Sequence, residues 1–550
     1  IPYTKGKEVK LMQIESLPQQ MVDVVQNNNG LKLYLNSLIK GRKATPPSWL
    51  YEDRAWTDVM SDWLNNYLKP ALDVKDPILK KVFQLELSQL KKAGPQGEVK
   101  PVEELMDLVT EGYKLANSPK PRLFNEKLWH EAKELAIKYL FKDTGLYKRL
   151  RRRAQDQVVD DMRDRDTLES NSGWRDFSRR KLANVLRNAY EDIANGDYLK
   201  HPAILLFRNY NNKTRPVWMY PMSVNIVEGS FTQPLKEMLM KYTSLRFFSP
   251  WRGYEEVSLD LTEAYNAGYV ISASDFSHTD AHFTKWAMLE VYDVIKFGFQ
   301  ESEWKDLKQS MLHVVDIPLV VGPSKWITGA HGVSSGSNWT NDVETYMDFI
   351  ISCYLQLSHL ITNPFSGIGD DMAHKQSSYN TKFAQQVSQI CLRGGFDVNA
   401  EKVTNDLDSV KYLQRLTFRG WVSQFRTLNG ISLLRGVYST IRALNSSMNP
   451  EKFHSPKLWS KDMFAVRQFM ILENCIDHPL FEEFVKFICK GHSYLGEFAA
   501  SKDTKIDESW RKSRLIPGLN PTYNQEKRDK PLSTFVSIRI ARELQQSGAL

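Results

Sequence analysis

Apolar residues recur three and four positions apart over much of this chain, which is the spacing of an amphipathic helix. Residues 78–92 and 128–141 follow this pattern and predict two helices, each ending in a charged or glycine-containing loop. An apolar stripe from Met288 to Phe299 predicts a third helix, with the stripe in the core. Beyond about residue 430 the pattern is again largely helical.

The middle of the chain contains shorter apolar runs between polar turns. Residues 204–207, 217–220 and 269–271 are of this kind and predict strands. Residues 365–373 predict a strand, a tight turn at Gly369-Asp370 and a second strand. Strands grouped within a mostly helical chain indicate an α+β protein.

The composition indicates a folded protein with a modest positive charge. Hydrophobic residues make up 42% of the 550 residues and aromatic residues 11%, which is enough for a large core. A net charge of +8 suits a polyanionic partner, although it is equally compatible with simple solubility. The longest apolar stretch, residues 347–361, contains Asp348 and His359 and is too short to span a bilayer. It predicts a buried helix and no membrane partner.

Several kinds of chemistry have no motif in the sequence. The chain lacks a GxxxxGK[ST] phosphate loop, an HExxH zinc motif and a GxSxG nucleophile elbow, which argues against a P-loop NTPase, a zinc protease and a serine hydrolase. Its four cysteines are far apart and form no CxxC pair, so neither a zinc site nor a disulfide framework is expected.

Three aspartates are placed where a pair of metal ions could be held. Asp275 follows the predicted strand at residues 269–273, and Asp370 with Asp371 lies in the predicted hairpin. If the two strands are neighbours, Asp275 and Asp370 converge. Carboxylates are preferred ligands of Mg²⁺ (or Mn²⁺), and two such ions suit nucleotidyl transfer. The plainer interpretation is that these are ordinary turn aspartates.

The acids belong to an ordered series of motifs. Asp275-Phe-Ser-His-Thr-Asp280 comes first, a small-residue loop with Ser335-Gly336 follows, and Gly369-Asp370-Asp371 comes last. Three elements in this order are far more specific than a lone Gly-Asp-Asp. Between about residues 170 and 420 the sequence resembles the viral RNA-dependent RNA polymerases, most closely those of picobirnaviruses and next those of partitiviruses.

The resemblance implies a right-hand polymerase fold, mostly helical with an antiparallel palm sheet. We expect residues 1–70 to form an amino-terminal extension that bridges fingers and thumb, and residues 71–255 to form the fingers. Residues 256–420 would form the palm, with a fingers insertion near 301–333. Residues 421–550 would form a helical thumb and a carboxy-terminal tail.

The resemblance also assigns roles around the acids. Asp275 and Asp370 would bind two metal ions with Asp371 in support, and Asp280 would help to recognise the ribose 2′-hydroxyl. Ser335, Gly336 and Thr340 match the family's Ser-Gly loop and the helix after it. The chain departs from the family where an asparagine is common, because Glu344 stands there and Asn341 directly follows Thr340. Whether Asn341, Glu344 or neither contacts the sugar stays open.

Other motifs resemble the family's nucleotide and RNA contacts. Arg208, Lys213 and Arg215 fall in a segment like the basic hairpin that covers the incoming triphosphate. Ser172-Gly173 resembles the motif beside which the template enters, and Arg415 ends a Tyr-Leu-Gln-Arg segment like the primer-grip hairpin. Lys402 occupies the position of a lysine that protonates the departing pyrophosphate, although an ordinary solvated lysine is an equal alternative.

These features together predict RNA-templated RNA synthesis for a double-stranded RNA virus. The expected partners are template RNA, its product duplex, ribonucleoside triphosphates and a viral capsid protein, in the virion interior and the host cytoplasm. A reverse transcriptase is one rival, but its usual aromatic-x-Asp-Asp hairpin differs from Ile368-Gly-Asp-Asp, and Asp280 favours ribose. A non-enzymatic, capsid-associated RNA-binding protein is the other, but it has no use for paired carboxylates.

Two basic segments can each be interpreted in two ways. Residues 148–153 form the densest basic cluster, which is either a solvated helix face or the lining of a passage for RNA or nucleotides. The basic, proline-containing tail from residue 502 either folds back into the polymerase channel or packs on the thumb.

Overall fold

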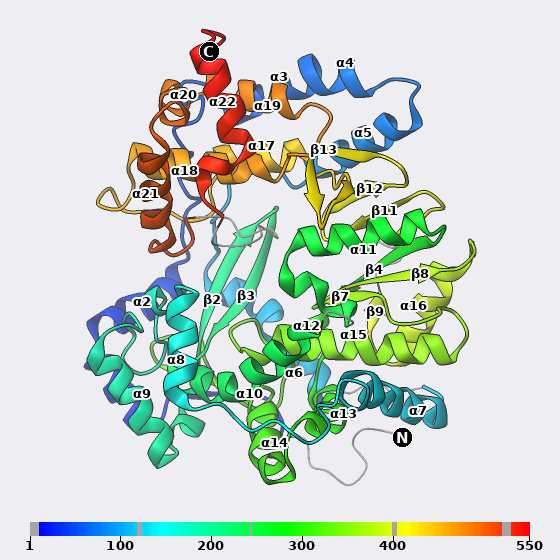
Figure 1. Cartoon of the computed structure of the whole chain (residues 1–550). Helices are drawn as coiled ribbons and strands as arrows, with labels where there is room; N and C mark the ends of the chain where they lie inside the picture. Colours follow the sequence, from blue (N-terminus) through cyan, green and yellow to red (C-terminus); the bar gives the residue numbers. More distant parts are fainter. Residues whose placement is uncertain (1–9, 118–123, 243–244, 399–403, 520–529) are drawn as a thin grey trace.

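The structure, a computed structural model, describes residues 10–117, 124–242, 245–398, 404–519 and 530–550 (Figure 1). It is an α+β fold in which two mixed or antiparallel sheets and two hairpins lie among many helices, as predicted. The described helices and strands gather around two large hydrophobic clusters. One cluster surrounds the sheets and the other joins the carboxy-terminal helices.

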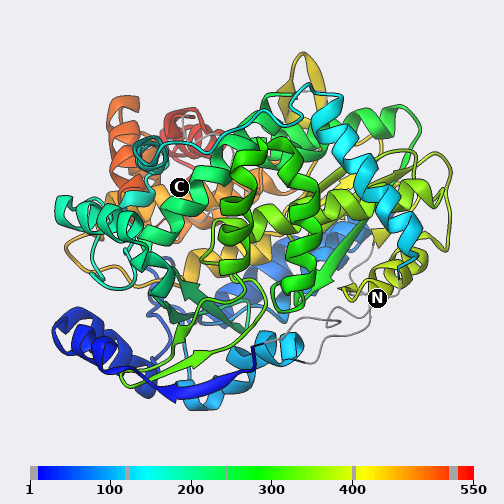
Figure 2. The same cartoon turned by 90° about the horizontal axis from the view of Figure 1, so that it is seen from below.

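The first sheet carries the predicted basic hairpin. Its strand order is β1 (Gln13–Ser16), β6 (Lys325–Thr328), β5 (Leu319–Val320), β2 (Ala203–Tyr210) and β3 (Lys213–Met219). Strands β2 and β3 pair antiparallel around a two-residue turn, and both turn residues, Asn211 and Asn212, have positive φ. Asparagine tolerates this left-handed conformation, which matches the twist of a tight hairpin. In Figure 2, β1 lies along the edge of this sheet beside β6.

The second sheet carries the acids. Strand β4 (Val270–Ser277) pairs antiparallel with β8 (Asp371–Gln376), and β8 pairs with β7 (Ser366–Ile368). The short strands β10 (Thr404–Asn405) and β9 (Asp397–Val398) pair with successive parts of β4. This pairing extends β4 beyond its predicted end, so Asp275 lies within the strand and not just after it.

Helices cover both faces of this sheet (Figure 1). Helix α11 (Tyr254–Asn266) packs on one face, against Ile271 and Ala273 of β4. Helices α15 (Trp339–Leu357) and α16 (Phe383–Arg393) contribute to the cluster on the other face, which includes Met372 of β8. The sheet is therefore held in a sandwich of helices, and its turns can present polar residues.

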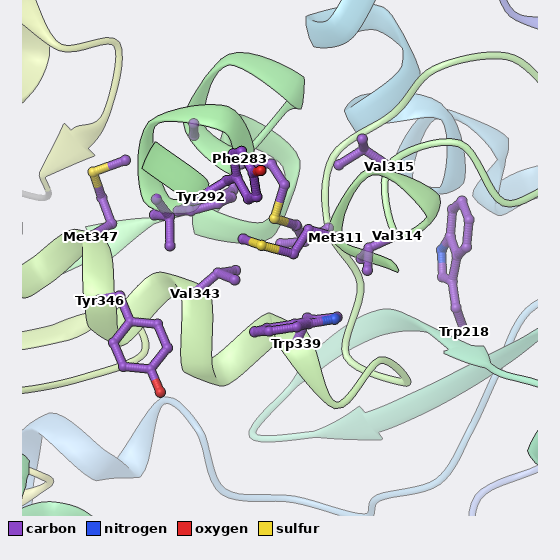
Figure 3. Packing of buried hydrophobic residues seen from close by; sticks show 14 of the residues in the cluster. Trp218, Phe283, Tyr292, Met311, Val314, Val315, Trp339, Val343, Tyr346 and Met347 are labelled. Carbon is purple, nitrogen blue, oxygen red and sulfur yellow. The ribbon is translucent and has the colours of Figure 1, made fainter. Parts of the chain in front are cut away.

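Helix α15 is the centre of the larger cluster. Nearly all its side chains are buried, and Trp339, Val343 and Met347 pack among Phe283 and Met311 from neighbouring segments (Figure 3). The Trp339 indole N–H donates to Ser310 Oγ at 3.0 Å. The burial of this helix was predicted from residues 347–361, although the helix begins earlier, at Trp339, and ends at Leu357. Its first turn is thereby fixed beside the sheet.

The other helices of the larger cluster surround α15 and the sheets. Helices α8 and α9 reach it through a small cluster that they share with α10. The bounds of these helices are α1 (Gln19–Gln26), α2 (Asn29–Lys40), α6 (Met106–Asn117), α7 (Glu126–Ile137), α8 (Gln155–Asp164), α9 (Ala183–Asn195), α10 (Met222–Lys241), α12 (Thr279–His282), α13 (Lys285–Ile295) and α14 (Trp304–His313).

The second cluster joins residues 49–93 to the carboxy-terminal helices. It contains three early helices and six late ones: α3 (Trp56–Trp63), α4 (Lys69–Leu72), α5 (Pro77–Leu90), α17 (Thr440–Met448), α18 (Lys461–Glu473), α19 (Phe481–Lys490), α20 (Ser493–Ala499), α21 (Asp503–Arg514) and α22 (Val536–Gln546). Helix α5 thus packs with the carboxy-terminal helices, although its sequence position suggested the fingers. The division into fingers, palm and thumb stays a prediction.

Two hairpins connect the acid-bearing sheet to the second cluster. They are β11 (Ser409–Tyr412) with β12 (Arg415–Phe418), and β13 (Val422–Leu428) with β14 (Ile431–Leu434). The first confirms the predicted hairpin around residues 412–415, with Leu413 and Gln414 at positive φ in its turn.

The basic cluster at residues 148–153 is not a helix face, which corrects one of the two interpretations. The segment is irregular, and three of its five basic residues form ion pairs. Lys148 pairs with Glu301, Arg152 with Glu303 and Asp306, and Arg153 with Glu237. The cluster therefore fastens neighbouring segments together.

Candidate active site

The three predicted metal-binding aspartates come together. Asp275 and Asp371 stand directly opposite each other on β4 and β8, and the Phe276 amide donates to the Asp370 carbonyl at 2.8 Å. One carboxylate oxygen from each of Asp275, Asp370 and Asp371 lies within 4.8 Å of the other two. The predicted convergence of Asp275 and Asp370 is confirmed.

The donor set suits Mg²⁺ or Mn²⁺. All three ligands are carboxylate oxygens, which these hard ions prefer. Asp370 is exposed, and Asp275 and Asp371 are half-buried, so water and phosphate oxygens can complete the coordination. The site thus meets the needs of an ion that retains part of its hydration.

The turn that carries Asp370 rests on helix α15. Gly369 has a φ of 55°, and its amide donates to Thr345 Oγ1 at 2.9 Å. A Cβ at Gly369 would lie 3.0 Å from Asn341 Nδ2 and 3.7 Å from Glu344 Oε2. Both residues that could recognise the ribose therefore lie beside the acids.

Asp280 and Glu344 form a pair of carboxyl groups next to the metal-binding acids. Glu344 is buried, and burial is the main cause of its strongly raised pKa. The charge of Asp280 and a hydrogen bond between the two carboxyl groups raise the pKa of Glu344 further, as does the charge of Asp370. These effects favour the protonated form of Glu344 beside Asp280.

The small-residue loop before α15 packs directly on the backbone of two other elements. A Cβ at Gly332 would lie 2.2 Å from the Asp280 carbonyl oxygen, and one at Gly336 would lie 1.6 Å from the Trp218 carbonyl oxygen on β3. The Thr340 hydroxyl is buried and donates to the Ser334 carbonyl, whereas Ser335 is exposed. Glycine is required at Gly332 and Gly336 because no side chain fits there.

The basic hairpin presents its cations on one face. Arg208 stands opposite Arg215, and Tyr210 opposite Lys213. The guanidinium groups of Arg208 and Arg215 lie 4.6 and 4.3 Å from the centroid of the Tyr210 ring. The Arg215 Nη1 atom is buried and has no hydrogen-bond partner among the described residues. Arg208 also forms a two-pronged ion pair with Glu451, at 2.9 and 2.8 Å.

The remaining predicted site residues lie elsewhere. Ser172 is buried, and its carbonyl accepts the Met222 amide at 2.8 Å, while Gly173 packs against the Tyr220 carbonyl at the start of α10. Arg415 is also buried, with its guanidinium 4.2 Å from the Tyr254 ring centroid. It borders a cavity of about 460 Å³ between residues 165–170, the hairpins and the carboxy-terminal helices. Lys402 lies outside the described residues.

Two buried acids near the site were not assigned from the sequence. Asp348 lies one helical turn after Glu344, and burial together with the charges of Asp370 and Asp371 raises its pKa well above the usual range. Glu228, on α10, accepts hydrogen bonds from the loop that precedes α15. The sequence did contain a signal for such residues, namely an acidic residue inside an otherwise apolar helical stretch. An acidic residue in that setting is buried and therefore needs a polar partner.

Known proteins resemble this chain over most of its length. Residues 210–439 match the family model of the viral RNA-dependent RNA polymerases. The chain is 27% identical over 487 residues to the potential RNA-dependent RNA polymerase of a human picobirnavirus (strain Human/Thailand/Hy005102/-), covering 84% of this chain and 85% of that protein. Two crystal structures share the fold: a human picobirnavirus RNA-dependent RNA polymerase and its insertion-loop deletion mutant. Each has a TM-score of 0.78 and 22% identity, over 96% of this chain and 100% of that one.

The fold is thus that of a right-hand polymerase, as predicted. The similarities in sequence indicate the class, a template-dependent nucleotide polymerase. The chain is similar to the viral RNA-dependent RNA polymerases, and its activity is the RNA-templated synthesis of RNA, a nucleotidyl transfer. Neither a reverse transcriptase nor a non-enzymatic RNA-binding protein is favoured by these similarities. Among the described residues, no helix has both the length and the apolar character needed to cross a membrane.

Proposed function

We propose that Asp275 and Asp370 are the main ligands of two Mg²⁺ (or Mn²⁺) ions and that Asp371 supports them. The observation that carries this proposal is the approach of all three carboxylates to within 4.8 Å. Two bound divalent ions would lower the proton affinity of the attacking 3′-hydroxyl and would balance the charge of the leaving pyrophosphate. The three aspartates would hold these ions at the place where the reacting phosphate binds.

The basic hairpin is proposed to hold the triphosphate. Lys213, Arg215 and Arg208 share one face of β2 and β3, and the buried Nη1 of Arg215 lacks a protein acceptor among the described residues. A buried donor without a partner is costly, and a phosphate oxygen would satisfy it. The Tyr210 ring keeps the two guanidinium groups in place.

Asp280 is proposed to select ribose. A carboxylate accepts a hydrogen bond from the 2′-hydroxyl, and a deoxyribose leaves that acceptor unpaired, which costs about 1–3 kcal/mol. Glu344, buried and hydrogen-bonded to Asp280, orients that carboxylate. Asn341 is exposed, and its Oδ1 accepts from the Trp251 indole at 3.1 Å, so its amide nitrogen is the group turned toward the turn at Gly369. Asn341 and Ser335 are therefore the proposed sugar contacts beside Asp280, and Gly336 and Thr340 shape their loop.

Contacts to RNA are proposed at two further places. Ser172 and Gly173 would guide the template beside α10, and Arg415 would support the product duplex from the hairpin next to the 460 Å³ cavity. Basic side chains outnumber acidic ones around that cavity, which suits a phosphate backbone. Lys402 is proposed to protonate the leaving pyrophosphate.

The biological setting is also a proposal. The similarity to a human picobirnavirus protein supports replication and transcription of a double-stranded RNA genome. In that setting the polymerase would act inside the virion, in contact with a capsid protein, and in the host cytoplasm during infection.

Replacing Asp370 tests the metal site. Asp370→Asn keeps the shape of the side chain but weakens its binding to a divalent cation, so template-dependent incorporation should fall at least about a hundredfold. The measurement is extension of a short RNA template and primer by ribonucleotides with Mg²⁺, together with RNA affinity and Tm. The matched control, Asp53→Asn, alters an exposed turn aspartate ahead of α3. Synthesis by Asp370→Asn within a few-fold of the wild type would remove Asp370 from the site.

A further inference from the structure

A buried glutamate lies beneath the Ser-Gly loop. Glu228, on α10, is only 1% exposed. Its Oε2 accepts from the Ser337 hydroxyl, and its Oε1 accepts from the Asn338 amide at 3.1 Å and from Asn225 Nδ2 at 3.0 Å. The carboxyl group is therefore fully engaged, and two of its three donors belong to the two residues that follow Gly336.

Asn225 extends these contacts along the loop. Its Nδ2 also donates to the Gly336 carbonyl at 3.2 Å, and its own carbonyl accepts from Asn338 Nδ2 at 2.9 Å. Arg180 donates to Asn225 Oδ1 at 2.9 Å and to the Asn171 carbonyl at 3.2 Å. The buried network therefore reaches from the Ser-Gly loop to the residue before Ser172-Gly173.

The position of this loop matters because two proposed binding elements meet there. Gly336 lies against β3, the strand that carries Lys213 and Arg215, and Asn338 directly precedes α15, whose first turn carries Asn341. If the loop moved outward, Ser335 and Asn341 would shift relative to Asp280 and to the basic hairpin. The loop has no apolar side chain between Ser334 and Asn338 to anchor it, so its polar contacts fix its place.

We propose that Glu228 is a positioning residue for nucleotide selection: through Ser337 and Asn338 it fixes the Ser335-Gly336 loop against the triphosphate hairpin. This inference rests on the proposed roles of Asp280, Ser335 and the hairpin. Glu228 itself does not touch the nucleotide. Its loss should weaken nucleotide binding and ribose selection more than it slows the chemical step.

A second buried glutamate in the same chain provides a control. Glu86, on α5, accepts from the amides of Thr440 and Ile441 at the start of α17, at 2.7 and 3.0 Å. It therefore caps a helix as Glu228 does, but in the second hydrophobic cluster, away from the acids. Loss of either cap should lower stability, whereas only loss of Glu228 should alter nucleotide selection.

The test compares Glu228→Ala, Glu228→Gln and Glu86→Ala in the full chain, with a short RNA template and primer and Mg²⁺. For Glu228→Ala we expect the KM for ribonucleotide to rise at least about fivefold and the preference for ribo- over deoxyribonucleotide to fall by a similar factor, with a smaller change in kcat. Glu228→Gln can still accept from Asn338 and Asn225 and should recover most of both values. Glu86→Ala should lower Tm and leave both values unchanged.

Other outcomes are equally decisive. Wild-type KM and ribose preference in Glu228→Ala would overturn the inference, even if its Tm falls. If Glu228→Ala does not fold, Ser337→Ala removes one of the three contacts, and it should shift KM and ribose preference in the same direction by a smaller factor; no shift would overturn the inference. Activity of Asp370→Asn separates the two proposals. If that variant is inactive while Glu228→Ala matches the wild type, only the role of Glu228 is wrong.

Discussion

His374 lies in the acid-bearing sheet, three residues after Asp371, with both ring nitrogens buried and without hydrogen-bond partners among the described residues. Its ring meets that of Phe383 edge-on, with centroids 5.8 Å apart. Burial lowers the pKa of His374 from 6.5 to about 4, because the surroundings offer nothing to stabilise an imidazolium. The folded protein therefore keeps this histidine neutral where the unfolded chain would protonate it.

The stability of the fold should depend on pH through His374. Between pH 6.5 and about 4, His374 binds a proton in the unfolded chain but not in the folded protein. The free energy of unfolding therefore decreases as pH falls through this window, by about 3 kcal/mol at most. His374→Leu should therefore lose less stability than the wild type between pH 7 and pH 5, as measured by denaturant unfolding. The control His130→Gln alters a histidine with a 70% exposed side chain and should follow the wild type. Equal losses in His374→Leu and the wild type would refute this account.

At the scale of single residues, the sequence predicted the acids better than their neighbours. The patterns placed Asp275 at a strand and Asp370 in a hairpin, and their convergence was predicted on the condition that the two strands are neighbours, which they are. The orientation of Asn341 and Glu344 depends on the rotation of α15, which is set by where that helix begins and what it packs against. The burial of Arg415 against Tyr254 was not predictable either, because the two residues are far apart in the chain.

At the scale of elements, the Ser-Gly loop is the connection with the least room for change. A Cβ at Gly336 would lie 1.6 Å from the carbonyl oxygen of Trp218, a backbone atom that cannot turn aside. Gly336→Ala should therefore displace the loop from β3, lowering stability by about 1–3 kcal/mol and nucleotide incorporation at least about tenfold.

Gly322→Ala is the matched control for this prediction, because nothing lies within 4 Å of a Cβ built there. Thermal unfolding and primer extension, measured side by side, check both variants. Wild-type incorporation by Gly336→Ala would show that the contact with β3 does not hold the loop in place.

The helices predicted at residues 78–92 and 128–141 and the turn at Gly369-Asp370 followed from local patterns, whereas the hairpin of β13 and β14, helix α10 and the shortest elements did not. Strands β5, β9 and β10 contain two residues each, and a pattern of alternating polarity cannot be recognised over such a length. The segment at residues 148–153 was open to a helical interpretation because basic residues favour helices, but it is irregular, and ion pairs to residues 301–306 and to Glu237 hold it against neighbouring segments.

At the scale of the whole molecule, contacts distant in sequence join the parts around the site. Arg208 of the basic hairpin pairs with Glu451, just after α17, and Arg514 at the end of α21 pairs with Asp166 at 3.1 Å. Helices α3 to α5 share a core with the last six helices. No local pattern predicts such pairings, because they depend on the complete topology, and the family resemblance alone suggested an arrangement of this kind.

The central claim is that Asp275, Asp370 and Asp371 hold two divalent ions at the point of nucleotide addition. The most direct test is a crystal structure of the full chain with Mn²⁺, a template and primer, and a non-hydrolysable ribonucleoside triphosphate, with anomalous scattering used to locate manganese. We predict two manganese peaks, about 4 Å apart and ligated by Asp275 and Asp370. An ordered nucleotide with no manganese peak within ligand distance of these two carboxylates would contradict the account.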